Sequence, residues 1–401
     1  MKIDTVQIQN FLTIRYDTRM QSSISPIKIQ NFTKSSSDPN GFKTEKLLTT
    51  SFEKHFANNS DPISISLSGG IDSTLILGIL RKTFPKRKIF AICGVFEDAF
   101  DESKTAKKVA EKFGADFKIV KMDSIFTNMP KIISITKKPK WNTYTHLIAQ
   151  EAKKHSKNFV TGDGADEVFG GYTFRYEKFL HLLSKNSTWK NKVINYLECH
   201  NRDWVPDQEK MFHKKTGFNW NEIYLIFKVF FNNKLEPLKQ VMLADFNGKL
   251  LYDFIPLGNS IAEFYSLQNF SPFLDKDVID FGLKLPISQK YNIKENKGKI
   301  TLRKISSRLG VKHIDEKRGF SPNILFDWKK NGQRICESIL LEKNCNIYKK
   351  QLINHDWVLR SFEKISNDGD IRYMNRMISI LALELWFKIF VTEEIKPNKK
   401  L

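Results

Sequence analysis

Two short glycine-rich strings contain residues that could bind a ligand and take part in catalysis. Residues 66–74 read Ser-Leu-Ser-Gly-Gly-Ile-Asp-Ser-Thr, and residues 161–172 read Thr-Gly-Asp-Gly-Ala-Asp-Glu-Val-Phe-Gly-Gly-Tyr. Glycines let a backbone come close to a ligand, and amides at the start of a helix bind anions. A carboxylate inside such an anion site is repelled unless a cation is present. The residue types therefore indicate a site for phosphate and a divalent metal ion.

The first string has the context that a phosphate-binding loop requires. An apolar strand pattern over residues 62–67 runs into it, and an apolar helical pattern follows at once. Asp72 lies within the loop, and a carboxylate of this kind suits Mg²⁺. The string differs from the Gly-x-x-x-x-Gly-Lys-Ser/Thr loop, and a plain glycine turn is the alternative. The anion-binding candidates are two hydroxyls and two glycines: Ser68, Gly69, Gly70 and Ser73.

The second string places two carboxylates, Asp163 and Asp166, directly after another strand pattern. One of them can serve a metal and the other a proton. Strand and helix patterns alternate from residue 45 to residue 161, which predicts an α/β fold: a parallel twisted sheet with helices on both faces. Both strings leave carboxyl ends of strands, so they can face one site. The predicted strands are 62–67, 88–95, 117–120 and 158–161, and the predicted helices are 47–56, 103–113 and 146–155.

We divide the chain into three parts from these patterns. Residues 1–45 form a short N-terminal arm with strand patterns such as Phe11–Tyr16, and residues 46–175 form a nucleotide-binding α/β core. Residues 176–401 form a mostly helical C-terminal part that completes the active site and ends in an apolar helix over 377–390.

Composition excludes several classes of protein. The 401 residues are 41% hydrophobic and 27% charged, as in an ordinary globular enzyme, and contain no run of 18 apolar residues. We therefore expect no membrane partner, and the lack of a signal-peptide pattern predicts a cytoplasmic protein. The four cysteines form no Cys-x-x-Cys pair, which argues against a zinc ribbon or a disulfide scaffold: Cys93, Cys199, Cys336 and Cys345.

The net charge of +21 could signal a nucleic-acid partner. Lys far outnumbers Arg, however, and the chain is rich in Lys, Ile, Asn and Phe together, a bias that A+T-rich coding can produce. Attraction of an anionic small substrate explains part of the charge. We do not expect nucleic acid as a partner.

Both strings resemble known families. The first is similar to the pyrophosphate loop of the N-type ATP pyrophosphatases, of the adenine nucleotide alpha hydrolase-like fold, which release AMP and pyrophosphate. The second resembles Ser-Gly-Glu-Gly-Ala/Ser-Asp-Glu-Leu-Phe-Gly-Gly-Tyr of the asparagine synthetases. The resemblance spans roughly residues 45–390. Further matching strings follow in the family's order: Phe100-Asp101-Glu102, Ser271-Pro272-Phe273-Leu274-Asp275, Lys299 to Arg303, Lys317-Arg318-Gly319-Phe320 and Leu383-Glu384-Leu385-Trp386.

The resemblance implies a carbon–nitrogen ligase that uses ATP and Mg²⁺. A small carboxylate substrate attacks the α-phosphorus of ATP, acyl-AMP and pyrophosphate form, and an amine then displaces AMP to give an amide. By this resemblance the first string holds the pyrophosphate, and Asp72 and Asp166 bind Mg²⁺. Gly162 and the strand end at Ile92 would lie near the nucleoside.

The resemblance also implies individual roles. Lys317 would stabilise the α-phosphate and then the acyl oxyanion. Asp163 stands where the family has Glu and would accept a proton from the amine; the related β-lactam-forming synthetases have Tyr there. Asp275 would position Lys317 or the substrate, or simply cap a helix. Lys299 and Arg303, four residues apart, would bind phosphate or carboxylate, or form an exposed basic face.

The family's glutaminase half, whose nucleophile is a cysteine after the initiator Met, has no counterpart in these residues. We therefore expect ammonia to arrive free or from a separate glutaminase, or another amine to serve. Charged residues of the family are also replaced, by Asn259-Ser260, by neutral residues over 266–270 and by Lys138-Pro139-Lys140. These replacements leave the identity of the acceptor open, and we expect aspartate or a related acid. Two other readings stay open: a tRNA-modifying ATP pyrophosphatase that adenylates a base, and a non-catalytic scaffold.

Overall fold

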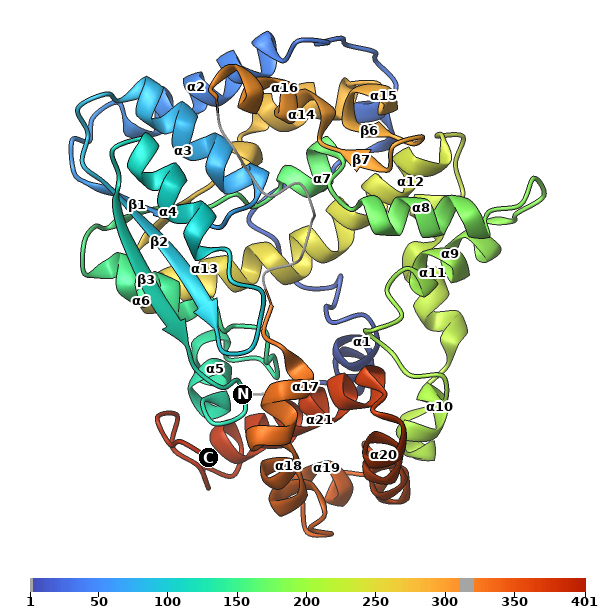
Figure 1. Cartoon of the computed structure of the whole chain (residues 1–401). Coiled ribbons are helices and arrows are strands. Elements are labelled where there is room, and N and C mark those ends of the chain that lie inside the picture. Colours follow the sequence, from blue (N-terminus) through green and yellow to red (C-terminus); the bar gives the residue numbers. More distant parts are fainter. Residues whose placement is uncertain (1–2, 311–320) are drawn as a thin grey trace.

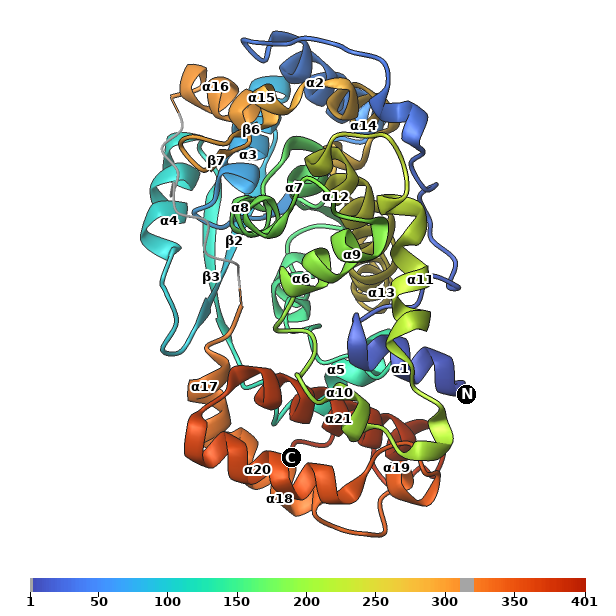
Figure 2. The same ribbon diagram turned by 90° about the vertical axis from the view of Figure 1, so that its right-hand side faces the viewer.

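A five-stranded parallel sheet lies in the upper part of the molecule, toward the left in Figures 1 and 2. The computed structural model describes residues 3–310 and 321–401. The strand order is β3-β2-β1-β4-β5. In the register, Ser66 of β1 pairs with Ile92 of β2, and Ile65 of β1 pairs with Val160 of β4. The carboxyl ends of β1 and β4 therefore lie within one residue of each other. The strands are β1 Ile63–Ser66, β2 Ile89–Phe96, β3 Asp116–Met122, β4 Asn158–Val160 and β5 Gln268–Phe270.

Helices cover both faces of the sheet. Along β2, Ala91 and Cys93 belong to the core on one face, whereas Ile92 belongs to the core on the other. This alternation is what a strand buried on both sides requires. The first face is covered by α2 Phe42–Phe56, α3 Ile71–Thr83 and α4 Ser103–Lys112, and the second by α6 His146–Lys153 and α13 Ile255–Phe264. The predicted α/β fold class is confirmed, as are the predicted strands and helices of residues 46–161.

Two sequence predictions about the fold are wrong. The N-terminal arm contains no strand among its described residues. The strand-like pattern Phe11–Tyr16 falls on the last residues of helix α1, Thr5–Thr13, and on the turn that follows it. Asp4 and Gln7 form a capping box at its start, and Ile8, Phe11 and Leu12 bury one helical face. The boundary at 175 does not hold for the sheet either, because β5 comes from the C-terminal part.

The middle and the C-terminal part are mostly helical, as predicted. The middle helices are α5 Met129–Thr136, α7 Ala165–Phe169, α8 Thr173–Leu182, α9 Trp189–Glu198, α10 Gln208–Met211, α11 Trp220–Phe231 and α12 Pro237–Asp245. The π-helical segment η3, Phe246–Phe254, joins α12 to α13 without a break. Beyond β5 lie α14 Lys276–Lys284, α15 Ile287–Lys290, α16 Ile300–Arg308 and the short hairpin β6 Tyr291–Asn292 with β7 Lys297–Gly298.

A second hydrophobic core fills the lower half of the molecule (Figure 1). Its central helix is the apolar α21, Ile371–Phe390, around which α1 and α5 also pack. The other helices there are α17 Ile324–Asp327, α18 Gln333–Leu340, α19 Asn346–Lys349 and α20 His355–Asp368. Of the helices described, none is long and apolar enough to cross a membrane.

Candidate active site

The two glycine-rich strings meet at the carboxyl ends of β1 and β4, as the sequence predicts. A side chain on Gly162 would place its Cβ 3.2 Å from Asp72 Cβ and 3.7 Å from the Ser73 nitrogen. Only a residue without a side chain fits there unless a neighbour moves. The first turn of α3, whose backbone N–H groups have no partner within the helix, therefore faces the second string directly.

The first string is held in shape by its own hydroxyls. Ser73 Oγ accepts a hydrogen bond from the Ser68 backbone N–H at 3.0 Å, and Ser68 Oγ accepts one from the Gly70 N–H at 3.1 Å. The two hydroxyl oxygens lie 3.1 Å apart. Phosphate oxygens arriving here would thus meet an ordered loop at the start of a helix, which favours anion binding.

Glu102 is a member of this site to which the sequence analysis gave no role. The Gly69 N–H donates to Glu102 Oε2 at 2.9 Å, so this amide is engaged before any phosphate arrives. Burial raises the pKa of Glu102, and the Gly69 amide partly opposes that shift. The available signal was its place in the Phe100-Asp101-Glu102 string, just before α4.

Asp72 and Asp166, the two carboxylates assigned to a metal, converge on the side chain of Lys299. Lys299 Nζ lies 2.5 Å from Asp72 Oδ2 and 2.6 Å from Asp166 Oδ1, and the lysine side chain is only 5% exposed. Burial alone would lower the pKa of Lys299, but the two carboxylates outweigh burial and raise it. Lys299 is thus part of the site and not of an exposed basic face.

The backbone at Lys299 explains why its side chain points inward. Its φ of 57° and ψ of 38° place it in the left-handed region, immediately before α16 begins at Ile300. Lys299 and Arg303 consequently do not share a helical face. Arg303 instead donates from Nε to the Gly298 carbonyl at 2.8 Å.

The carboxylate pair fits a magnesium ion by the chemistry of its donors. Asp72 and Asp166 already share one cation, the Lys299 ammonium, and Asp72 Oδ1 is buried with no hydrogen-bond partner in the described part of the chain. Within those same ranges no group of three His, Cys, Asp or Glu side chains could hold a metal. Mg²⁺ commonly takes one or two carboxylates and completes its shell with phosphate oxygens and water.

Asp163 lies in the same turn with its carboxylate held in place. Thr161 Oγ1 donates to Asp163 Oδ2 at 2.8 Å, and Ser271 Oγ donates to the Asp163 carbonyl at 2.7 Å. Burial raises the pKa of Asp163, and the charges of Asp166 and Asp72 add to this effect against the Thr161 bond. A carboxylate with a raised pKa is a better proton acceptor than an exposed one.

The remaining predicted site residues fall in different places. Lys317 lies outside the described residues. Asp275 caps α14, because its side chain accepts from the Asp277 backbone N–H at 2.8 Å, which matches the capping alternative. Ile92 is not at a strand end: β2 continues to Phe96, and the Ile92 carbonyl accepts from the Leu67 N–H at 2.8 Å. Ile92 does lie opposite the last residue of β1.

The neutral residues of β5 do not all face the site. Phe270 packs on the side of α2, with its ring centroid 3.9 Å from that of His55 and 5.8 Å from that of Phe52. Asn269, on the other side of the strand, lies beside Gly258: a Cβ on Gly258 would be 3.3 Å from Asn269 Nδ2 and 4.0 Å from Asp163 Oδ2. The neutral residue at position 270 therefore gives little information about the acceptor substrate, because its side chain packs against α2.

A family model and several curated proteins match most of this chain. The asparagine synthase family model matches residues 43–388. Asparagine synthetase [glutamine-hydrolyzing] 1 of Bacillus subtilis is 25% identical over 374 residues, which cover 84% of this chain and 58% of that protein. A putative asparagine synthetase [glutamine-hydrolyzing] of Mycobacterium bovis is 25% identical over 83% of this chain and 55% of that protein. The chain thus spans less than two thirds of the length of these relatives.

A solved structure with a weaker likeness is the U34-tRNA thiolase of Methanococcus maripaludis. It is 14% identical, covers 81% of this chain and 79% of its own, and superposes with a TM-score of 0.33. A likeness of this size carries no functional argument.

Proposed function

The chain belongs to the asparagine synthase family, and from this premise we propose that it is an ATP-dependent, amide-forming ligase that releases AMP and pyrophosphate. The observation that carries the proposal is the meeting of Asp72 and Asp166, from two strings 94 residues apart, on one buried cation. A structural turn has no need of this arrangement, whereas a nucleotide site needs paired carboxylates beside an anion-binding helix start.

Different residues would bind the phosphates, hold the metal ion and stabilise charge during adenylation. The start of α3, with Ser68 and Ser73, holds the phosphates that leave as pyrophosphate. Asp72 and Asp166 would hold Mg²⁺, which when bound neutralises charge on the leaving group. Lys299 is within reach of both carboxylates and can move its ammonium toward a phosphate oxygen. Lys317 remains our candidate for the cation at the α-phosphate.

The second step needs an amine and a proton acceptor. Asp163, with its raised pKa and its place beside the open backbone of Gly258, would accept the proton as the amine attacks the acyl-adenylate. We propose aspartate or a related acid as the acceptor. Free ammonia, or ammonia from a separate glutaminase, would supply the nitrogen.

The products of the nucleotide test this proposal. With Mg²⁺, ammonia and a panel of carboxylic acids, we expect acid-dependent formation of AMP and pyrophosphate, and exchange of ³²P-pyrophosphate into ATP. Asp166→Asn should lower the exchange by about 10²–10³-fold, whereas the exposed control Asp277→Asn should not. Formation of ADP and phosphate, or exchange that needs no acid, would overturn it; exchange stimulated by tRNA instead of an acid would favour base adenylation.

A further inference from the structure

The turn between β1 and α3 has three consecutive backbone N–H groups, on Ser68, Gly69 and Gly70, that all donate to side chains. Two of the acceptors are hydroxyls: Ser73 Oγ accepts from Ser68, and Ser68 Oγ accepts from Gly70. A hydroxyl that accepts a hydrogen bond can still donate its own proton to a phosphate oxygen. The third acceptor is the Glu102 carboxylate, at 2.9 Å from the Gly69 nitrogen, and an ionised carboxylate has no proton to donate.

The start of α4 places the Glu102 carboxylate for this contact. Glu102 is the N-cap residue of that helix, but the capping oxygen comes from Asp101, whose Oδ1 accepts from the Ser103 N–H at 2.8 Å. The side chain of Glu102 makes no capping bond and reaches Gly69 instead. Because α4 packs against β2 and α3 (Figure 1), the sheet and its covering helices fix where Glu102 begins.

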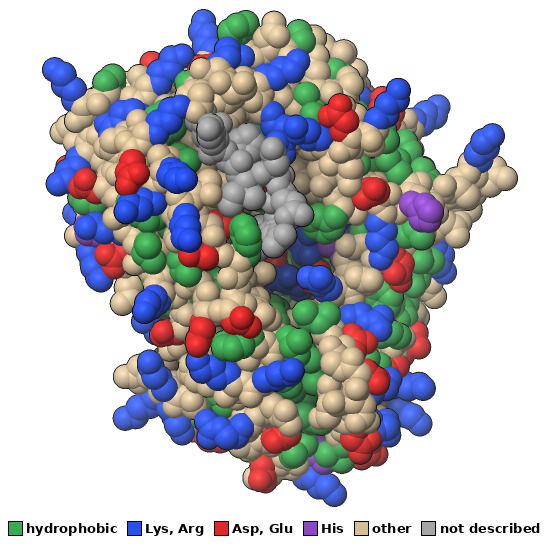
Figure 3. Space-filling view, in the orientation of Figure 1, with side chains coloured by type: hydrophobic (Ala, Val, Ile, Leu, Met, Phe, Trp, Pro, Cys, Tyr) green, Lys and Arg blue, Asp and Glu red, His purple; other side chains and the backbone are tan. Residues whose placement is uncertain are grey.

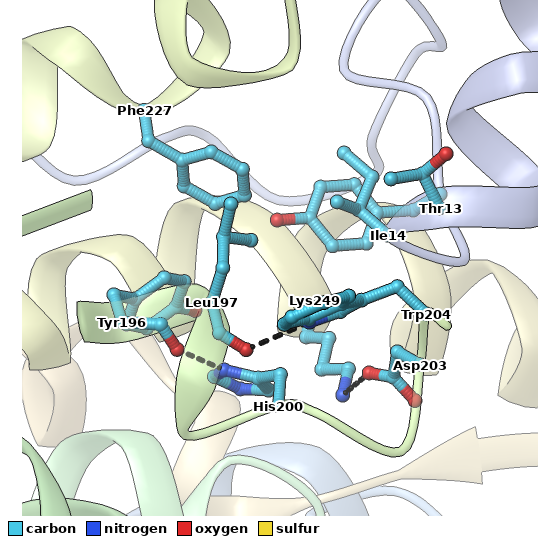
Figure 4. Close-up of a pocket in the computed structure, with 10 residues that line it drawn as sticks. Thr13, Ile14, Tyr196, Leu197, His200, Asp203, Trp204, Phe227 and Lys249 are labelled. Carbon is cyan, nitrogen blue, oxygen red and sulfur yellow. Dashed lines mark hydrogen bonds and ion pairs between the residues drawn. The ribbon is translucent and has the colours of Figure 1, made fainter. Parts of the chain in front are cut away.

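Glu102 has no cation beside it, although cations are plentiful on this chain. Lys and Arg side chains are scattered over the whole face of the molecule in Figure 3, yet Glu102 forms no ion pair with any residue of 3–310 or 321–401. Figure 4 shows the opposite arrangement elsewhere, where Lys249 lies 2.6 Å from Asp203. Burial acts on both carboxylates, but Lys249 helps to lower the pKa of Asp203, whereas the pKa of Glu102 is raised.

Glu102 is therefore the one acceptor at this turn that works against an anion. A phosphate oxygen and the Glu102 carboxylate compete for the same N–H of Gly69, and their negative charges repel each other. The two serine hydroxyls and the first turn of α3 favour a phosphate at the same place. The affinity of the turn for a phosphate group is thus a balance, and Glu102 carries the unfavourable part of it.

We propose that Glu102 weakens the binding of pyrophosphate at this turn and thereby helps this product to leave after adenylation. The inference rests on the proposed function, which identifies the leaving anion as pyrophosphate. Glu102 would accept again from the Gly69 N–H as pyrophosphate departs, so the amide keeps a hydrogen bond throughout. A product that is held too tightly slows each turnover, so a carboxylate at this position favours release.

Binding of pyrophosphate in the presence of excess Mg²⁺ tests the inference, because it needs neither the acceptor acid nor the amine. In isothermal titration calorimetry we expect Glu102→Gln to bind pyrophosphate about 10- to 100-fold more tightly than the wild type. The glutamine amide oxygen can still accept from Gly69 but carries no charge. The direction of the change is decisive, since a variant that merely damaged the turn would bind more weakly.

Two further variants of Glu102 make the test independent of one substitution. Glu102→Ala leaves the Gly69 N–H free for a phosphate oxygen and should also bind pyrophosphate more tightly. Glu102→Asp keeps the negative charge and should bind no more tightly than the wild type. Glu97→Gln is the matched control, because Glu97 lies in the same loop but pairs with Lys330. Its affinity for pyrophosphate should equal that of the wild type.

Unchanged or weaker binding in both Glu102→Gln and Glu102→Ala would overturn the inference, as would an equal gain in Glu97→Gln. The role in release has its own readout: pyrophosphate should inhibit amide formation by Glu102→Gln at a correspondingly lower concentration, and unchanged inhibition would contradict it. The proposed function fails separately. If Glu102→Gln binds pyrophosphate more tightly while no acid supports exchange of ³²P-pyrophosphate into ATP, the effect of Glu102 on binding stands and only the ligase activity is refuted.

Discussion

Lys299 is the residue that joins the separate parts of the site. Its ammonium lies where the two carboxylates that we propose as magnesium ligands converge, and it partly neutralises their charge. When phosphates and Mg²⁺ arrive, the ammonium would share or leave that position. The same side chain can then pair with phosphate, because its flexible stem carries a compact charge.

Gly171 leaves room for this arrangement, and its substitution should disturb it. A Cβ there would lie 1.7 Å from Asp166 Oδ1 and 2.4 Å from Lys299 Cε. Gly171→Ala should therefore displace Asp166 or Lys299 and lower pyrophosphate exchange by about 10²-fold or more. The circular dichroism spectrum should stay native. Wild-type exchange in this variant would show that the contact of Lys299 with Asp166 is dispensable.

Asp163→Asn is expected to separate the two chemical steps. Removal of the proton acceptor should lower amide formation by about 10²–10⁴-fold and affect pyrophosphate exchange much less. Equal losses in both steps would contradict the assigned role. Thr161→Val, which removes only the hydroxyl donor to Asp163, is a milder companion variant.

Asp163→Asn also has a predicted effect on the stability of the protein. The pKa of Asp163 is raised in the folded chain from the ordinary 3.8, so its ionisation costs stability as the pH rises through and above 3.8. Asp163→Asn should therefore raise the Tm at pH 7, and the gain should vanish near pH 3, where the carboxyl is protonated in both states. A pH-independent change would argue against a buried ionised carboxylate.

At the scale of elements, Lys290 of α15 packs against Gly170, near the end of the second string. A Cβ on Gly170 would lie 3.0 Å from Lys290 Cβ. The buried Lys290 donates from Nζ to the Leu283 carbonyl at 3.3 Å. Burial, with a smaller effect of Lys239, lowers the pKa of Lys290 to about 7.

Lys290→Met should stabilise the protein in a pH-dependent manner. Below pH 7 the folded state carries a buried ammonium, so the full cost in stability is present. Between pH 7 and 10.5 the folded lysine is neutral while the unfolded lysine is still charged, so this cost falls steadily and is gone near pH 10.5. We expect a gain of a few kcal/mol at pH 6 that shrinks toward pH 10. Thermal unfolding of this variant and of the exposed control Lys276→Met across that range would test it.

At the scale of the whole molecule, buried charges join the N-terminal arm to the middle helices. The arm meets η3 and the loop after α9 through Arg15, Lys249, Asp203 and Asp253. Burial alone would raise the pKa of Asp253, but Lys140 and Arg15 outweigh it and lower that pKa below 3.8. The pKa values of Asp203 and Asp245 are lowered in the same way, by Lys249 and by His200 with Arg175.

Acid should therefore weaken the contact between these parts. A carboxyl with a lowered pKa adds stability above its unfolded value of 3.8, and this stability is lost as the pH falls below it. Asp253→Asn should cost about 3–5 kcal/mol at pH 7 and should make the fall of Tm between pH 5 and pH 3 less steep. The exposed Asp277→Asn should change neither by much. An unchanged Tm in Asp253→Asn at pH 7 would show that this ion pair is not needed.

The sequence by itself determined four of the five strands of the sheet, the two strings and their meeting point. Periodicity marks strands and helices locally, and parallel strands bring their carboxyl ends to one edge, so the two strings could be expected to face one site. The pairing of Asp72 with Asp166 in particular came from the resemblance to the asparagine synthetases. The same reasoning failed for α1, where a capping box at Asp4 and Gln7 was the overlooked signal. It also could not place β5, a three-residue strand far from the others in sequence.

Only the tertiary structure decided which charges act together. Lys299 could have been an exposed basic residue, but its left-handed backbone directs its side chain toward the site. Phe270 faces α2, and Arg15 reaches a cluster whose other members come from residues 140 to 253. Such contacts depend on how distant elements pack, and packing is a long-range property that the local pattern of apolar and polar residues does not encode.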